Sequence, residues 1–244
     1  MSLGARMLNV FAMPGTVFTE VRMIRPMLSN WLVPALLMVV IASISYSTLM
    51  SQPAVQQKFR EQQEQAMNKA VETGKFSRAD ADRQIELTRM LFSPGLMIVW
   101  CSIFGTIYGF LRVFWWALVL WALARFLLKT HVRFGKALEV SGLAGLIGIL
   151  GVGVTMLLQT NFGNPAASPN VALLADPASS GGFSSLMLGT MNVFYIWQAL
   201  VLAVALSRLS DVPFARAAVV FFPFWLALQF AMMTLGASVL GLFG

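Results

Sequence analysis

The stretch from Gly95 to Leu128 constrains the fold most, because its 34 residues contain only two charges, Arg112 and Arg125. As an α-helix this stretch would be about 51 Å long at ~1.5 Å per residue. The hydrocarbon core of a bilayer is only ~30 Å thick. No turn signal interrupts the stretch, so two crossings are excluded. The sequence therefore predicts one long membrane-spanning helix that protrudes at one end and carries Arg112 in its body.

The composition of the whole chain indicates a membrane protein. Of the 244 residues, 58% are hydrophobic and 11% are charged, whereas soluble domains contain about 25% charged residues. The apolar segments are spread along the chain, so we expect a single integral domain over residues 1–244. The predicted fold is an all-α, polytopic helical membrane protein with five spans, at residues 31–50, 95–128, 137–159, 185–206 and 217–243.

The first 30 residues are amphipathic rather than spanning. Apolar residues recur at steps of three and seven, which predicts one apolar stripe along a helix; they are Leu8, Phe11, Phe18 and Val21. Pro14 favours the start of a new helix at that point. The stripe fits a helix in the cytoplasmic membrane interface, and it equally fits a helix packed under the spanning bundle. Both can hold together.

Residues 51–93 have a different character, with seven Lys or Arg and six Asp or Glu. They predict an extramembrane helical hairpin on the outer side. Gly74 ends its first helix, and Ser77 with Asp80 caps its second. Three carboxylates of the second helix could together bind a cation, namely Asp80, Asp82 and Glu86. Solvated helix charges are much commoner, so we expect no metal site.

The third span is rich in small residues. Gly142, Gly145, Gly148 and Gly151 follow one another at steps of three. Small residues let helix backbones approach closely in lipid. We therefore interpret these glycines as packing positions rather than as a substrate path.

The distribution of basic residues predicts the orientation. Residues 1–30, 125–136 and 207–216 together contain nine Lys or Arg, whereas the loop 160–185 contains none. Basic residues gather on the cytoplasmic side of short loops. We therefore expect a cytoplasmic N-terminus, an external C-terminus and a location in the cell's inner (plasma) membrane.

Arg112 is the main candidate functional residue. If Arg125 marks the cytoplasmic boundary, Arg112 lies about 20 Å into the membrane at ~1.5 Å per residue. A guanidinium in the core costs at least ~2.5–3.5 kcal/mol on insertion scales, so it should face protein or water. Polar residues in or near the spans complete a candidate intramembrane site of Arg112, Gln159, Asn192, Gln198 and Gln229. Arg112 either fixes helix orientation or binds an anion or a lipid headgroup.

Three segments carry a resemblance to the Yip1 domain family. They are Phe11 to Phe18 (FAMPGTVF), Phe134 to Leu138 (FGKAL) and Trp197 to Ala217 with its SRLSDVP link. The resemblance implies a five-span membrane protein with a cytoplasmic N-terminus. Eukaryotic members are associated with Rab GTPases and vesicle traffic, and they carry an acidic-Leu-Tyr-Gly-Pro motif that this sequence lacks. The short N-terminus and the lack of sorting motifs indicate similarity to the bacterial members.

No catalytic motif is present: the sequence contains no HExxH, GxSxG, Walker A or CxxC pattern. The single histidine, His131, lies among cations. We therefore expect no enzyme activity, no cofactor and no nucleic-acid partner. The predicted function is that of a membrane organiser that binds lipids or proteins, with membrane lipids, a homo-oligomer or a membrane-protein partner as its contacts. The alternative is a transporter or channel for an ion, a small solute or a lipid.

Overall fold

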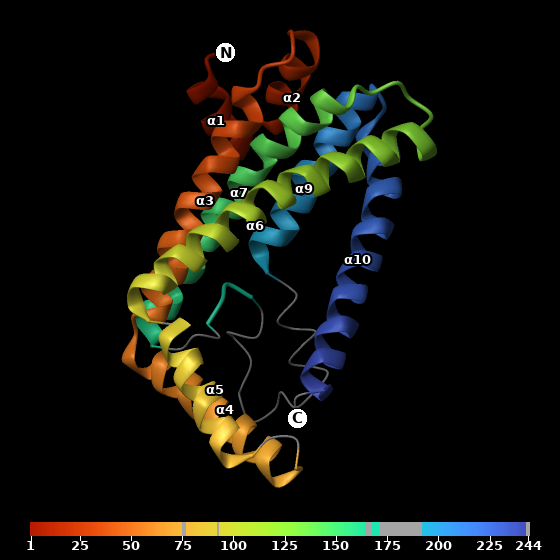
Figure 1. The fold of residues 1–244 in the computed structure, drawn as a ribbon. Helices are drawn as coiled ribbons and strands as arrows, with labels where there is room; N and C mark the ends of the chain where they lie inside the picture. Colours follow the sequence, from red (N-terminus) through yellow and green to blue (C-terminus); the bar gives the residue numbers. More distant parts are fainter. Residues whose placement is uncertain (75–76, 92, 164–166, 171–191, 243–244) are drawn as a thin grey trace.

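A computed structural model of the chain describes residues 1–74, 77–91, 93–163, 167–170 and 192–242 (Figure 1). In this part of the chain the regular structure is helical, apart from one isolated bridge between Asn170 and Asn192. The helices are α1 (Leu3–Ala12), α2 (Pro14–Met23), α3 (Ser29–Met50), α4 (Pro53–Glu72), α5 (Arg78–Leu91), α6 (Pro94–Ala122), the π-helical η1 (Leu123–Leu127), α7 (Phe134–Phe162), α9 (Val193–Ser210) and α10 (Phe214–Leu242).

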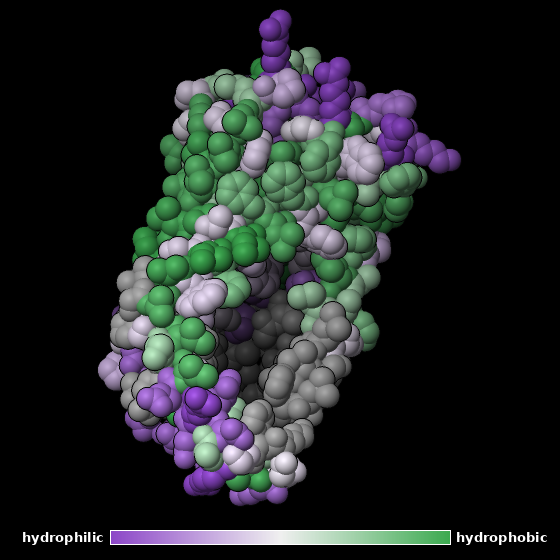
Figure 2. Space-filling model, viewed as in Figure 1, coloured by the Kyte–Doolittle hydropathy of each residue, from purple (hydrophilic) through white to green (hydrophobic). Residues whose placement is uncertain are grey.

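Five segments are long and apolar enough to cross a membrane. They are Ser29–Met50, Val99–Leu127, Phe134–Phe162, Val193–Ser210 and Phe214–Met232. Figure 2 shows an apolar band over them between two polar ends of the molecule. The polytopic all-α fold predicted from the sequence is confirmed.

The long apolar stretch is helical throughout, but its last turn is wider than an α-helix. In η1 the Leu128 amide donates to the Leu123 carbonyl at 3.0 Å, five residues back. The amide and the hydroxyl of Thr130 both donate to the Ala124 carbonyl, at 2.9 and 3.2 Å. These bonds, with Lys129 at a φ of 57°, end the helix. The sequence did not predict this π-turn, a feature found mostly as single turns within α-helices.

Helix α7 is the centre of the bundle, since it packs against α3, α6 and α9. Thirteen of its residues from Lys136 to Gly148 are buried without interruption. Of the four spaced glycines, three are in close contact with a neighbouring helix: Gly142 with Trp31, Gly148 with Arg112 and Gly151 with Phe194. No heavy atom would lie within 4 Å of a Cβ at Gly145.

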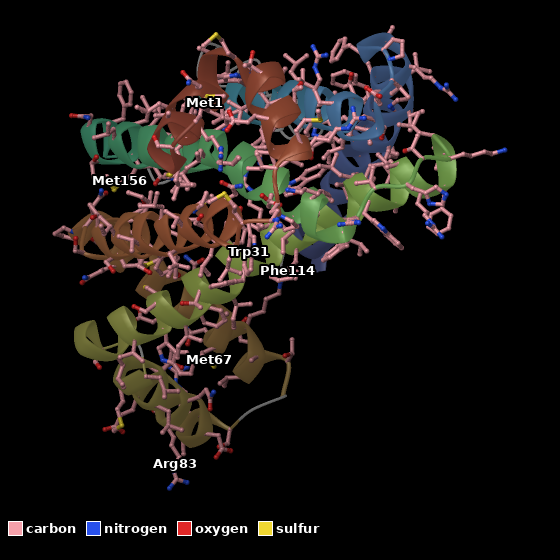
Figure 3. The ribbon with its side chains drawn as sticks, turned by 90° about the horizontal axis from the view of Figure 1, so that it is seen from above. Met1, Trp31, Met67, Arg83, Phe114 and Met156 are labelled. Atoms are coloured by element: carbon pink, nitrogen blue, oxygen red, sulfur yellow. The ribbon has the colours of Figure 1, made fainter. Side chains whose placement is uncertain are left out.

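Aromatic packing joins α3 to α6 near this crossing. The rings of Trp31 and Phe114 meet edge to face at 5.5 Å between centroids (Figure 3). Edge-to-face pairs are a favoured arrangement because of the ring quadrupole. This contact lies at the end of the bundle that α1 and α2 cover.

The N-terminal segment forms two helices that pack on α7 and α9 (Figure 1). Helix α2 begins at Pro14, as the sequence predicts. Of the predicted stripe, Phe18 and Val21 are fully buried in α2, whereas Leu8 of α1 is 74% exposed and Val10 is the buried apolar residue of that helix.

Helices α4 and α5 form a hairpin at the opposite end of the molecule from α1 and α2 (Figure 1). Gly74, which follows α4, has a φ of 70°, a conformation that favours glycine. At the start of α5 the Asp80 amide donates to Ser77 Oγ at 3.1 Å, the cap expected from the sequence. The side chains of Met67 and Arg83 lie on this hairpin, well away from Trp31 (Figure 3).

Helix α10 packs mainly on α9 and runs apart from α3 (Figure 1). Phe221, which is fully buried, lies 6.0 Å from Trp116 between ring centroids. Beyond this contact Leu226, Phe230 and Met232 are about three-fifths exposed. The expected beginning of the fourth span at residue 185 lies outside the described residues.

Candidate functional site around Arg112

Four helices enclose a cavity of about 250 Å³ on the side of the bundle nearer the hairpin. The described lining residues come from α3, α6, α7, the residue before α9 and the first turn of α9. They include Ser45, Tyr108, Arg112, Gly148, Gln159 and Asn192. Among the described residues that line the cavity, Arg112 carries the only charge.

The Arg112 guanidinium has neutral partners. Its Nη2 donates to Gln198 Oε1 from α9. Its Cζ lies 5.9 Å from the ring centroid of Tyr108, one turn earlier on α6, within the range of a cation–π contact. The ion pairs of the described residues do not include Arg112. The positive charge is therefore oriented but not neutralised.

A glycine of α7 makes room for this side chain. A Cβ at Gly148 would lie 2.7 Å from Arg112 Cζ, which is too close for any real contact. Because Gly148 has no side chain, the half-buried guanidinium of Arg112 fits between α6 and α7. The glycine that the sequence assigns to packing here accommodates the candidate functional residue.

The depth of the cavity follows from α9. Gln198 lies six residues after Asn192, about 9 Å at ~1.5 Å per residue, and twelve residues before Ser210, about 18 Å. Arg112 thus lies in the third of the bundle nearer the hairpin. Glu139, within the first two turns of α7, and Asp211, at the end of α9, are at the other end.

The structure brings together four of the five residues singled out from the sequence. Arg112, Gln159 and Asn192 line the cavity, and Gln198 binds Arg112. Asn192 also caps α9, because its Oδ1 accepts from the Phe194 amide at 2.9 Å. Gln229 lies on α10 and does not line this cavity.

Sequence reasoning missed two members of the site. Tyr108 lies four residues before Arg112, a spacing that brings side chains together on a helix and could have indicated the pair. Ser45 Oγ is buried in the cavity wall with no hydrogen-bond partner among the described residues. No sequence pattern marks Ser45, since a lone serine is common in apolar helices.

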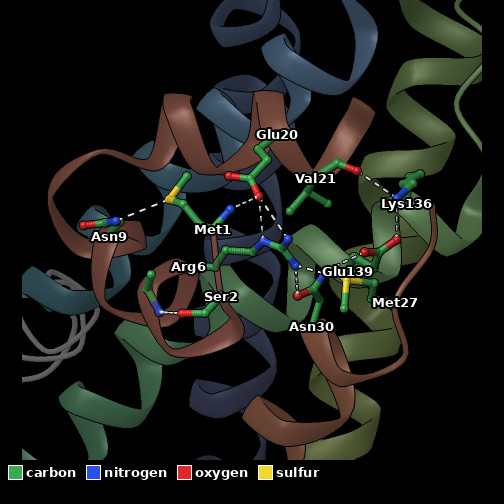
Figure 4. A network of polar contacts seen from close by, with 11 residues as sticks. Met1, Ser2, Arg6, Asn9, Glu20, Val21, Met27, Asn30, Lys136 and Glu139 are labelled. Atoms are coloured by element: carbon green, nitrogen blue, oxygen red, sulfur yellow. Dashed lines mark hydrogen bonds and ion pairs between the residues drawn. The ribbon is translucent and has the colours of Figure 1, made fainter. Parts of the chain in front are cut away.

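A second polar cluster, also missed, lies under α1 and α2 (Figure 4). Glu139 is 1% exposed, and its Oε1 lies 2.9 Å from Lys136 Nζ. Its Oε2 accepts from Asn30 Nδ2 at 2.6 Å, and Asn30 Oδ1 accepts from Arg6 at 3.2 Å. The buried Arg6 also pairs with Glu20 at 2.9 Å.

This network joins four helices, because Arg6 lies on α1, Glu20 on α2, Asn30 on α3 and Glu139 on α7. Lys136, interpreted from the sequence as part of a basic loop, is 8% exposed, and its Nζ also donates to the Val21 carbonyl at 2.7 Å. Buried charges are tolerated when they are paired and hydrogen-bonded. The network therefore fixes the N-terminal helices on the bundle.

An exposed ion pair strengthens the same junction. Arg22 of α2 lies 2.7 Å from Asp211, which follows α9. The hydrogen bond from Arg22, with its positive charge, lowers the pKa of Asp211 below its ordinary value of 3.8. Asp211 adopts a positive φ of 55° as the cap of α9, so backbone geometry sets the position of this carboxylate.

Five apolar spans define this chain as a multi-pass α-helical membrane protein. The model of the Yip1 domain matches residues 8–235, nearly the whole chain. The chain belongs to the Yip1 domain family. No curated protein and no solved structure matches it.

Proposed function

We propose that this protein is a non-enzymatic organiser of its membrane that binds lipid or protein partners, and that the cavity around Arg112 holds the anionic headgroup of a lipid. The observation that carries the proposal is a guanidinium that is oriented by Gln198 and Tyr108 and has no carboxylate partner among the described residues. A charge held this way inside a membrane protein is costly, at least ~2.5–3.5 kcal/mol on insertion scales. An anion bound in the cavity would offset this cost.

The rest of the cavity wall supports the same ligand. Two neutral amides, Gln159 and Asn192, line the end nearer the hairpin, and Ser45 adds a hydroxyl. Among the described residues that line it, the site offers one cation, several neutral groups and no acidic side chain, a composition suited to a phosphodiester.

The test is retention of phosphatidylglycerol by the detergent-solubilised full chain, measured by native mass spectrometry, with phosphatidylcholine as the uncharged comparison. Arg112→Gln should retain about tenfold less phosphatidylglycerol, since a hydrogen bond to a charged group contributes ~1.5–3 kcal/mol. Arg112→Lys keeps the charge but loses the planar fork, so it should be intermediate. Arg216→Gln, a loss of one exposed charge at the far end, is the matched control.

Two results would contradict the proposal. Equal retention by Arg112→Gln and Arg216→Gln would leave Arg112 with an architectural role only. Flux of an ion, a solute or a lipid in liposomes, abolished by Arg112→Gln, would instead favour the transporter or channel alternative. Gln159 and Asn192 would then be the first residues to test along the path.

We further propose that the N-terminus lies in the cytoplasm, with the hairpin and the C-terminus outside, in the cell's inner membrane. The support is the nine Lys or Arg of residues 1–30, 125–136 and 207–216 against none in 160–185. These three basic stretches lie at the α1–α2 end of the molecule, or in links that meet it. A C-terminal reporter that is active only in the cytoplasm would contradict this orientation.

A further inference from the structure

A second hollow, distinct from the Arg112 cavity, lies at the opposite end of the bundle. Its volume is about 390 Å³. Three separate stretches form it: residues 22–26 at the end of α2, residues 131–136 at the beginning of α7, and Leu209 of α9. Five basic side chains line what we name the basic hollow: Arg22, Arg25, His131, Arg133 and Lys136. No carboxylate is among its lining residues in the described part of the chain.

The charges of the basic hollow are only partly balanced. Arg22 pairs with Asp211 and Lys136 with Glu139. Arg25 and Arg133 take part in none of the ion pairs or side-chain hydrogen bonds found within the described residues. Two guanidinium groups therefore face the hollow without an anion to neutralise them.

The beginning of α7 adds further donors. Arg133 is its N-cap, no side chain caps the helix, and its first turn contains no acidic residue. A Cβ at Gly135 would meet no heavy atom within 4 Å, so the backbone there is open to a ligand. Uncapped amides at a helix N-terminus bind anions and especially phosphates. These amides lie next to Arg133, which lines the hollow, although Gly135 itself is not among the lining residues.

Apolar side chains lie beside these cations at the end of the spans. Met23 is 79% exposed and lines the hollow, and Leu28, just before α3, is 62% exposed. Helix α7 enters its buried segment at Lys136, so the basic hollow lies where the apolar band ends. Basic side chains next to exposed apolar ones are suited to the boundary between headgroups and acyl chains.

We infer that the basic hollow binds a phosphate group, either the phosphodiester of an anionic lipid or a soluble phosphate. Basic residues at the ends of spans commonly serve only to set the orientation of the protein in the membrane. Here, however, two segments far apart in the sequence, residues 22–25 and 131–136, gather their cations around one hollow, while Lys129 and Arg216 remain outside it. The site is independent of Arg112, and the two lie at opposite ends of the bundle.

The test compares two variants with the same change in charge. Arg25→Gln with Arg133→Gln removes the two unpaired guanidiniums. The control, Lys129→Asn with Arg216→Gln, removes two cations outside the hollow, and asparagine suits the positive φ at position 129. Native mass spectrometry of the full chain measures retention of phosphatidylglycerol against phosphatidylcholine, and calorimetry measures binding of inorganic phosphate.

The first variant should retain about tenfold less of one bound phosphatidylglycerol, because hydrogen bonds to charged groups are the strong ones. The control should retain phosphatidylglycerol within about twofold of the wild-type level, because no direct contact with the lipid is lost. Arg25→Lys with Arg133→Lys should recover part of the retention. Binding of inorganic phosphate, lost in the first variant, would identify a soluble phosphate as the ligand, and lipid retention alone would identify a headgroup.

The inference is overturned if the first variant and the control behave alike. It is also overturned if the wild-type protein binds no inorganic phosphate and retains phosphatidylglycerol no better than phosphatidylcholine. Arg112→Gln separates this site from the cavity, because it should leave the lipid in the basic hollow in place. If each variant loses one bound lipid and keeps the lipid that the other variant loses, the protein has two separate lipid sites.

Discussion

Replacement of single glycines of α7 by alanine tests how closely the helices pack. Gly142 and Gly145 lie one turn apart on the same helix and both are buried. A Cβ at Gly142 would lie 2.7 Å from Trp31 Cβ and 2.9 Å from the Asn30 carbonyl oxygen, with Trp31 Cα closer still. A Cβ at Gly145 would meet nothing within 4 Å. Gly142→Ala should therefore destabilise the bundle, whereas Gly145→Ala should not.

The magnitude follows from the contact distances. Carbon atoms pack at ~3.5–4.0 Å, so α3 must move by about 1 Å to admit a methyl group at position 142. Overpacking of this kind costs ~1–3 kcal/mol. Both variants gain the same helix propensity, up to ~1 kcal/mol from glycine to alanine, so this gain cancels between them. The difference between the two variants is therefore the overpacking cost itself.

Two features place the cost toward the upper end of that range. The obstacle at position 142 includes backbone atoms of α3, which cannot rotate away as a flexible side chain can. A shift of α3 would also disturb Asn30, which hydrogen-bonds Glu139.

Thermal unfolding in detergent micelles, followed by the loss of monodisperse protein on size-exclusion chromatography, measures the difference. A difference of ~2 kcal/mol should lower the Tm of Gly142→Ala by about 4–8 °C relative to Gly145→Ala. Equal Tm values would refute the close approach of α3 and α7. If Gly145→Ala has a lower Tm than Gly142→Ala, the neighbours that the structure assigns to these two glycines are wrong.

Three further perturbations test other parts of the structure. Phe11→Asp should loosen the N-terminal helices, because the charge would replace an edge-to-face contact with Trp197 at 5.9 Å; unchanged protease sensitivity of residues 1–25 would contradict this. Glu139→Gln should cost ~3 kcal/mol, since it leaves the buried Lys136 without its carboxylate partner, and thermal unfolding would reveal the loss. Asp211 has a lowered pKa, so its pairing with Arg22 is present at neutral pH and is lost as pH falls through that pKa, below 3.8; amide exchange in α2 should then rise, and Asp211→Asn should make this acid step smaller, with Glu20 of α2, whose pKa is also lowered, responsible for the remainder.

Much of the fold could be predicted because it depends on local properties of the sequence. The length and apolarity of the segment from Gly95 to Leu128 required a long spanning helix, and Pro14, Gly74 and Ser77 marked helix ends through their own backbone preferences. These signals act within a few residues of one another. The π-turn of η1 was missed because it depends on how Thr130 folds back onto Ala124, which no pattern of apolar residues encodes.

The candidate site could be predicted in part because a guanidinium in an apolar span requires a polar neighbour. Gln159, Asn192 and Gln198 were identified as polar residues in or near the apolar spans. Gln229 was included on the same ground, because the sequence does not show which helix its face of α10 meets. The network of Arg6, Asn30 and Glu139 was missed for the same reason: its members are up to 133 residues apart, and only tertiary packing brings them together.

The exposed part of α10 has a consequence for how the protein responds to its bilayer. Among the residues beyond Trp225 whose side chains the structure describes, Leu226, Phe230 and Met232 are exposed, so few contacts there fix the tilt of the helix. Its angle is therefore set largely by hydrophobic mismatch, which costs fractions of a kcal/mol per Å. In a thicker bilayer α10 should stand more upright, and in a thinner one it should lean further. The distance between α10 and the rest of the bundle should thus vary with acyl-chain length, so the position of this helix depends on the thickness of the membrane.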